Sequence, residues 1–328
     1  MNRLLKCLFL LLTLCCHLLP AAHGQQMGWR TARRFGGSDQ QAGQPNYVAG
    51  MVMDGQGNQY VAGSFVGVTD FGGIPYVSAG YHDGYLAKYN SAGVLQWVRR
   101  LAGPSDEFIY GLCLAPAGGC YVVGNYGGGA SLDGAGALPD TALVVARYDD
   151  AGNLTWHDIA ARHSPGSGLV TAYRVAADVA GRCYVIGEMG PVTRTFGSIT
   201  VTMPANAQST RNPVVWCYNA AGVVQWAKAT TITNMDALIT GIVSTNNGCV
   251  VTGRYSGEAG SVLGYPTDTT AGRGLGINYD GFVVALDSVG TTTWGSLIKN
   301  YVGRMLLAPP VLDGVTHWVP HLGYGTSA

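Results

Sequence analysis

The residue types that most often carry chemistry are present in this chain, but their spacing matches no catalytic pattern. His317 and His321 have the spacing of metal ligands on a helix, yet Pro320 between them opposes a helix and the region is typical of a strand. Residues 272–276 (Gly-Arg-Gly-Leu-Gly) superficially match a dinucleotide-binding loop, but no strand–helix–strand pattern surrounds them. His-Glu-x-x-His, Gly-x-Ser-x-Gly and phosphate-loop patterns are absent. We therefore predict no catalytic residues, no metal and no cofactor.

Three aspartates recur at one position of a repeat described below. Asp83, Asp140 and Asp280 each precede a strand, and such a ring of carboxylates could bind calcium or act in catalysis. Because they are equivalent residues of separate units, hydrogen bonding within each unit is the favoured interpretation.

The eight cysteines do not form a disulfide framework. Three lie in the first 24 residues, and the other five contain no Cys-x-x-Cys pair. Cys120, Cys183 and Cys249 occupy equivalent repeat positions, which predicts small buried hydrophobic side chains. A bridge between Cys113 and Cys120 across one hairpin remains open.

Composition predicts an all-β protein with many turns. The 328 residues include 49 Gly, 47% are hydrophobic and 12% are charged, which excludes a disordered chain. Of the 19 acidic residues, 16 are Asp and 3 are Glu, and Asp favours turns whereas Glu favours helices. Lys and Arg also number 19, so the chain has no net positive charge that would attract nucleic acid.

Residues 1–24 have the pattern of a secretory signal peptide. Arg3 and Lys6 precede the apolar run 7–19, and the small residues Ala22 and Gly24 predict cleavage before Gln25. The run is shorter than the roughly 20 residues of a membrane span. We expect a secreted, cell-surface or periplasmic protein with no membrane span after cleavage.

Two motifs recur in step along the chain. The first, Tyr-Val-x-Gly or a close variant, ends at Gly63, Gly124, Gly187 and Gly253, at separations of 61, 63 and 66 residues. The second, Gly-x-x-x-Trp, follows each of these. The tryptophan residues at this repeat position are predicted to pack each unit against the next: Trp29, Trp97, Trp156, Trp226 and Trp294.

Each unit resolves into four short strands, which in the first unit are 47–54, 58–66, 84–90 and 94–101. Several strands are apolar on both faces, so both faces of each sheet must be covered. Stacked four-stranded units of this kind predict a β-propeller, because a β-sandwich would not need this repeat. The predicted blades are about 47–101, 109–160, 172–229 and 239–298 within a domain 25–328. A partial blade combines 28–36 with 305–328, so either a five-unit ring closes imperfectly or, as we favour, the chain is the front part of a longer protein.

The motifs resemble those of the bacterial secreted β-propeller repeats often called SBBP repeats. Residues 54–65, 71–72 and 83–89 carry the resemblance, while Ala115, Ser244 and Asn212 depart from it. The resemblance implies a secreted or surface-associated binding scaffold without established chemistry. Residues 285–294 resemble, more loosely, the tryptophan-docking motif of quinoprotein dehydrogenases, but no cluster of channel residues accompanies them.

The predicted ligand-binding face is the end with the longer, unequal connections. The connections between the second and third strands (67–82, 127–139, 190–211, 256–279), and those between units, emerge at this end. Tyr and Arg there suit an extracellular protein or glycan. The alternative is a propeller enzyme, either a quinone- or metal-dependent oxidoreductase or a carbohydrate-active hydrolase or lyase. The candidate binding residues are Tyr76, Tyr81, His82, Arg100, Arg162, His163, Arg194, Arg211, Tyr265 and Arg273.

Overall fold

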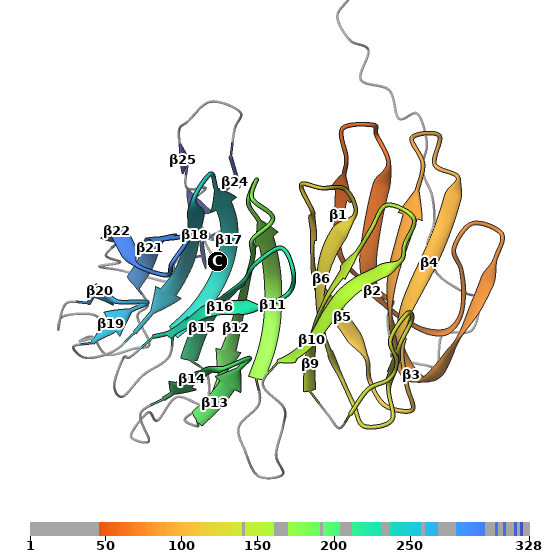
Figure 1. Cartoon of the computed structure of the whole chain (residues 1–328), viewed down its shortest axis with the longest axis horizontal. Coiled ribbons are helices and arrows are strands. Elements are labelled where there is room, and N and C mark those ends of the chain that lie inside the picture. The colour runs from red at the N-terminus through yellow and green to blue at the C-terminus, as the bar shows by residue number, and fades with distance from the viewer. Residues whose placement is uncertain are drawn as a thin grey trace, which may run out of the picture. The chain divides into compact units, whose positions relative to one another are not determined.

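The computed structural model describes residues 46–139, 142–160, 170–190, 193–203, 212–230, 237–256, 260–267 and 280–298, together with four short strands between 306 and 323. Every strand pair in these ranges is antiparallel, and the described residues contain no helix (Figure 1). Within the same ranges there is accordingly no helix that could cross a bilayer. The predicted leader 1–24 and Trp29 lie outside the described residues. The predicted all-β class is confirmed.

Four sheets, each built on four main strands, follow one another along the chain, and a short hairpin at Ser131–Ala137 adds two more strands to the first sheet beside its fourth strand. Sheet 1 contains β1 (Tyr47–Met53), β2 (Gln59–Asp70), β3 (Pro75–Tyr89) and β4 (Leu95–Ala102). Sheet 2 contains β5 (Phe108–Leu114), β6 (Cys120–Tyr126), β9 (Ala142–Tyr148) and β10 (Leu154–Ala160). Sheet 3 contains β11 (Val170–Ala177), β12 (Cys183–Met189), β15 (Asn212–Tyr218) and β16 (Val224–Ala229). Sheet 4 contains β17 (Ala237–Thr245), β18 (Gly248–Tyr255), β21 (Asp280–Asp287) and β22 (Thr292–Ile298).

The connections between second and third strands are more ordered than the sequence analysis predicted. In sheet 1, β2 and β3 continue as a paired ribbon to Asp70 and Pro75, so the prediction of a loop over 67–82 is wrong. The later connections contain the hairpins β7 (Ser131–Leu132) with β8 (Gly136–Ala137), β13 (Thr193–Phe196) with β14 (Ile199–Thr202), and β19 (Ser261–Val262) with β20 (Tyr265–Pro266). Each ribbon or hairpin buries at least one apolar side chain, among them Phe71, Leu132, Phe196 and Val262. This burial anchors the connections to the sheets.

A β-bulge recurs in the first strand of all four sheets and explains the repeated glycine. The bulged residues are Ala49, Tyr110, Tyr173 and Thr240. Beside each bulge, the first strand turns a backbone carbonyl towards Gly63, Gly124, Gly187 or Gly253 of the second strand. A Cβ atom on any of these glycines would collide with that carbonyl oxygen. Glycine is therefore required there for close backbone approach.

The hydrophobic core consists of layers between successive sheets. One layer joins residues such as Tyr60 and Leu86 of sheet 1 to Val122 and Val144 of sheet 2. A second layer joins sheets 2 and 3, and a third joins sheets 3 and 4. Strands such as β12 are buried along their whole length, as expected for sheets covered on both faces.

Four further strands lie near the carboxyl end of the sequence. β23 (Leu306–Leu307) pairs with β26 (Leu322–Gly323), and β24 (Val311–Leu312) pairs with β25 (Trp318–Val319). His317 and His321, the pair with metal-ligand spacing, lie outside the described residues.

Candidate functional site

Each inter-sheet layer is closed by a tryptophan that rests on a turn of the following sheet. The Nε1–H of Trp97 in β4 donates to the carbonyl oxygen of Asp150, at 3.1 Å. Its ring lies against Gly152, whose φ of 81° belongs to the same turn. A side chain at Gly152 would occupy the space of the indole, so the glycine is required both for the turn and for the docking.

The same arrangement recurs at the next two layers. Trp156 donates to the carbonyl oxygen of Ala220 at 3.1 Å, and its ring covers Gly222. Trp226 donates to the carbonyl oxygen of Ser288 at 2.9 Å and covers Gly290. The acceptor is thus always the second residue of the turn and the covered residue the fourth.

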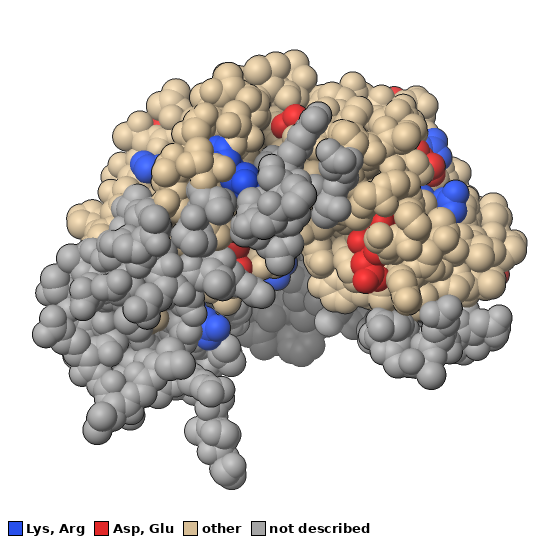
Figure 2. All heavy atoms as spheres, turned by 90° about the horizontal axis from the view of Figure 1, so that it is seen from below, with Lys and Arg blue, Asp and Glu red and all other residues tan. Residues whose placement is uncertain are grey.

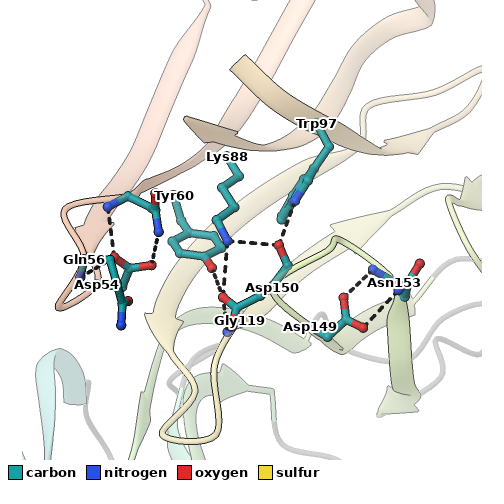
Figure 3. Close-up of polar contacts among 10 residues, drawn as sticks. Asp54, Gln56, Tyr60, Lys88, Trp97, Gly119, Asp149, Asp150 and Asn153 are labelled. Carbon is teal, nitrogen blue, oxygen red and sulfur yellow. Dashed lines mark hydrogen bonds and ion pairs between the residues drawn. The ribbon is translucent and has the colours of Figure 1, made fainter. Parts of the chain in front are cut away.

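Asp150 links sheets 1 and 2 at the first of these turns (Figure 3). Its carboxylate accepts hydrogen bonds from the Tyr60 hydroxyl at 2.6 Å, from the Gly119 N–H at 3.1 Å and from Lys88 Nζ at 3.2 Å. The buried Lys88 also donates to the Asp150 carbonyl oxygen. The Tyr60 hydrogen bond is the main cause that lowers the pKa of Asp150, although partial burial opposes it. This polar cluster holds two sheets together.

Trp294 holds the equivalent position in sheet 4, but its side chain is 45% exposed, compared with 8% for Trp226. Among the described residues, Trp294 does not rest on a glycine turn of another sheet, as the other three tryptophans do. Trp29 lies outside the described residues.

Four of the predicted binding residues lie on two neighbouring strands of sheet 1. Tyr76, Tyr81 and His82 are on β3 and Arg100 is on β4, so all four belong to strands. The Arg100 guanidinium lies 5.7 Å from the centre of the Tyr76 ring and 3.8 Å from an Asp83 carboxylate oxygen. His82 is buried, and its Nδ1 lies 2.8 Å from Asp106 Oδ1. Tyr81 is 59% exposed and is the most accessible of the four.

Neither of the other two candidates that the structure describes lies on sheet 1. Arg194 on β13 is only 8% exposed, which makes it part of the scaffold, and burial lowers the pKa of its guanidinium. Tyr265 on β20 packs against Gly295 of β22. Four lie outside the described residues: Arg162, His163, Arg211 and Arg273.

Two acidic side chains of this region are fully buried. The side chains of Asp83 and Glu107 are both 0% exposed. Asp83 accepts hydrogen bonds from the Ala79 N–H, in agreement with a structural role, and Asp280 at the same repeat position is 6% exposed. Asp140 lies outside the described residues. Burial raises the pKa of Glu107 to about 7, with smaller contributions from Asp83 and Asp106. Because neither carboxyl group reaches the surface, this pair offers little access to a substrate.

The sequence analysis missed a line of aromatic side chains on the first strands. The ring of Phe108 stacks on Tyr110 with centres 5.5 Å apart, and Tyr110 lies 6.4 Å from Tyr173 of the next sheet. The His82 ring continues the line at 4.9 Å from Phe108. Tyr110 and Tyr173 are the bulged residues of β5 and β11, so an aromatic side chain at the repeated bulge position was the signal that could have identified them.

A cavity of about 530 Å³ lies at the other end of the sheets. It is lined by the turns after β1, β5 and β11, including Asp54 and Asp178, and by Asp150. The carboxylates of Asp54 and Asp178 each accept backbone N–H groups of their own turn. Their positions are thus explained by the turns themselves.

The described residues contain no group of three or more His, Cys, Asp or Glu arranged to hold a metal ion. All five described cysteines are free thiols, so Cys113 and Cys120 are not bridged. Four of the five are buried, and burial raises the pKa of Cys217 to about 12. These thiols fit the predicted role of small hydrophobic side chains.

No family model matches this chain, and no curated protein matches it. Its function is therefore inferred from its own residues.

Proposed function

We propose that this chain is a secreted, bacterial β-propeller of the SBBP type. In this proposal it is a scaffold without catalytic activity that binds an extracellular protein or a polysaccharide. The leader-like residues 1–24 support secretion. Binding takes place at the end of the sheets that carries the ribbon of β2 and β3 and the connections between sheets.

The repeated junction supports the propeller. Three successive layers use one geometry, in which an indole N–H reaches the second residue of the next turn. A junction of this kind relates each sheet to the next in the same way, and repetition of one such step is how the blades of a propeller are arranged.

The observation that carries the binding role is the contact between Arg100 and the Tyr76 ring on sheet 1, together with the exposed Tyr81 of the same strand as Tyr76. Tyr81 is 59% exposed, and Val77 of the same strand and Ile74 of the turn before that strand are 61% and 52% exposed. An exposed apolar strip beside a tyrosine and an arginine is typical of recognition surfaces. Figure 2 views the end at which β13 and β14 lie in Figure 1, and uncharged residues cover most of its described surface. A ligand recognised largely by shape and hydrogen bonds suits this surface better than a highly charged polymer.

Capture of ligands by the purified mature protein tests this function. We expect a glycan array or a pull-down of extracellular proteins to give a ligand whose capture falls at least about tenfold in the double variant Tyr81→Ala/Arg100→Ala. Gln56→Ala, at the exposed turn of the opposite end, is the control and should bind as the wild type does. Equal capture by the double variant and the wild type would reject this surface as the binding site.

A further inference from the structure

The aromatic line on the first strands crosses from one sheet to the next. His82 of sheet 1 contacts Phe108 of β5, Phe108 stacks on Tyr110, and Tyr110 contacts Tyr173 of β11. We call these four residues the aromatic line. Phe108, Tyr110 and Tyr173 are each partly exposed, so these three rings reach the surface, whereas His82 is buried. Successive ring centres are 4.9, 5.5 and 6.4 Å apart.

Hydrogen bonds fix the two ends of the aromatic line. The Tyr173 hydroxyl donates to Glu188 Oε2 at 3.0 Å, and His82 Nδ1 lies 2.8 Å from Asp106 Oδ1. The bulges in β5 and β11 set the positions of Tyr110 and Tyr173. Rings held in this way lose little conformational entropy when a ligand binds, which favours affinity.

We propose that the aromatic line binds a linear polysaccharide made of pyranose units. This inference rests on the proposed function and names the ligand class. The separations between the three partly exposed rings, 5.5 Å from Phe108 to Tyr110 and 6.4 Å from Tyr110 to Tyr173, are close to the length of one sugar unit in an extended chain, so consecutive units can contact consecutive rings. Pyranose rings combine apolar C–H groups with hydroxyls, and tyrosine offers them both an apolar ring and a phenolic hydroxyl.

The shape of the aromatic line favours a polysaccharide over a protein. A stable protein partner needs about 800 Å² on each side with a fully buried apolar centre. The three partly exposed rings of the aromatic line are instead partly covered by one another and form no such centre. A row of rings that continues from one sheet to the next matches a chain-like ligand.

Calorimetric titration of the mature protein with hexasaccharides tests the inference. The probes are β-1,4-linked hexamers of glucose, N-acetylglucosamine and xylose, with hexagalacturonate as the acidic probe. We expect at least one probe to bind, and Tyr110→Ala to weaken that binding about tenfold or more. Tyr110→Phe keeps the aromatic ring and should lose less binding affinity than Tyr110→Ala. Trp294→Ala, which removes an exposed aromatic side chain of another sheet, is the matched control and should bind normally.

Folding of each variant is checked by its thermal unfolding transition. The inference is overturned if no hexasaccharide binds, or if folded Tyr110→Ala binds as tightly as the wild type. Capture of a protein that depends on Tyr81 and Arg100 but not on Tyr110 would overturn this inference and leave the proposed function intact. Loss of all ligands in every assay would reject both.

Discussion

The side chain of Glu107 is a buried acid with only part of its hydrogen-bonding capacity used. Its Oε1 accepts the Gly127 N–H at 3.3 Å, whereas Oε2 has no hydrogen-bond partner among the described residues. Burial, together with Asp83 and Asp106, raises the pKa of Glu107 to about 7. Because the ionised form is disfavoured in the folded state, this residue should make stability depend on pH.

Glu107→Gln should be more stable than the wild type at pH 8 but not at pH 4. An acid whose pKa is raised by folding binds more protons in the folded state, so wild-type stability falls as pH rises from about 4.5 through about 7. We expect a difference of about 1 to 3 kcal/mol in favour of Gln at pH 8, measured by urea unfolding. Asp70→Asn is the control, because backbone N–H groups of Gly72 and Gly73 lower the pKa of Asp70 and its effect has the opposite sign. A pH-independent difference for Glu107→Gln would contradict this account.

The bulge in the first strand, beside a glycine of the second strand, recurs in all four sheets. Its glycine belongs to the second strand and contacts a carbonyl oxygen of the first. The sequence alone showed that this glycine recurs, but it did not show the reason, which is the bulge.

Gly124→Ala should destabilise the protein, because the added Cβ would collide with the carbonyl oxygen of Phe108 and force β5 and β6 apart. We expect a loss of about 2 to 4 kcal/mol in urea unfolding. Gly128→Ala is the matched control, since no heavy atom lies within 4 Å of a Cβ built there, and it should change stability by less than about 1 kcal/mol. Equal stability of the two variants would show that the bulge tolerates a side chain.

At the scale of the whole molecule, stability depends on the layers between sheets. Each described layer contains apolar side chains from two sheets and one tryptophan docked on a glycine turn. Loss of one tryptophan therefore weakens the contact between two sheets rather than a single strand.

Trp156→Ala should cost about 3 to 5 kcal/mol, because it leaves a cavity between sheets 2 and 3 and removes the hydrogen bond to Ala220. Trp294→Ala removes the same residue type from the same register, but from a position that is 45% exposed, and should cost less than about 1.5 kcal/mol. Urea unfolding of the two variants gives the comparison. If Trp294→Ala lowered stability as much as Trp156→Ala, this account would be contradicted, because the Trp294 ring would then also be packed against another surface.

The amino-acid sequence by itself determined the all-β class, the four strands of each unit and the tryptophan positions, because these features repeat and each follows from local patterns of turns and apolar residues. Only the tertiary structure decided that the connection 67–82 is a paired ribbon and that His82, Phe108, Tyr110 and Tyr173 form a line. The physical reason is that a bulge changes the direction of a side chain without changing the residue pattern. Contacts between strands of different sheets likewise depend on how those sheets pack. The packing of sheets cannot be predicted from the local residue pattern.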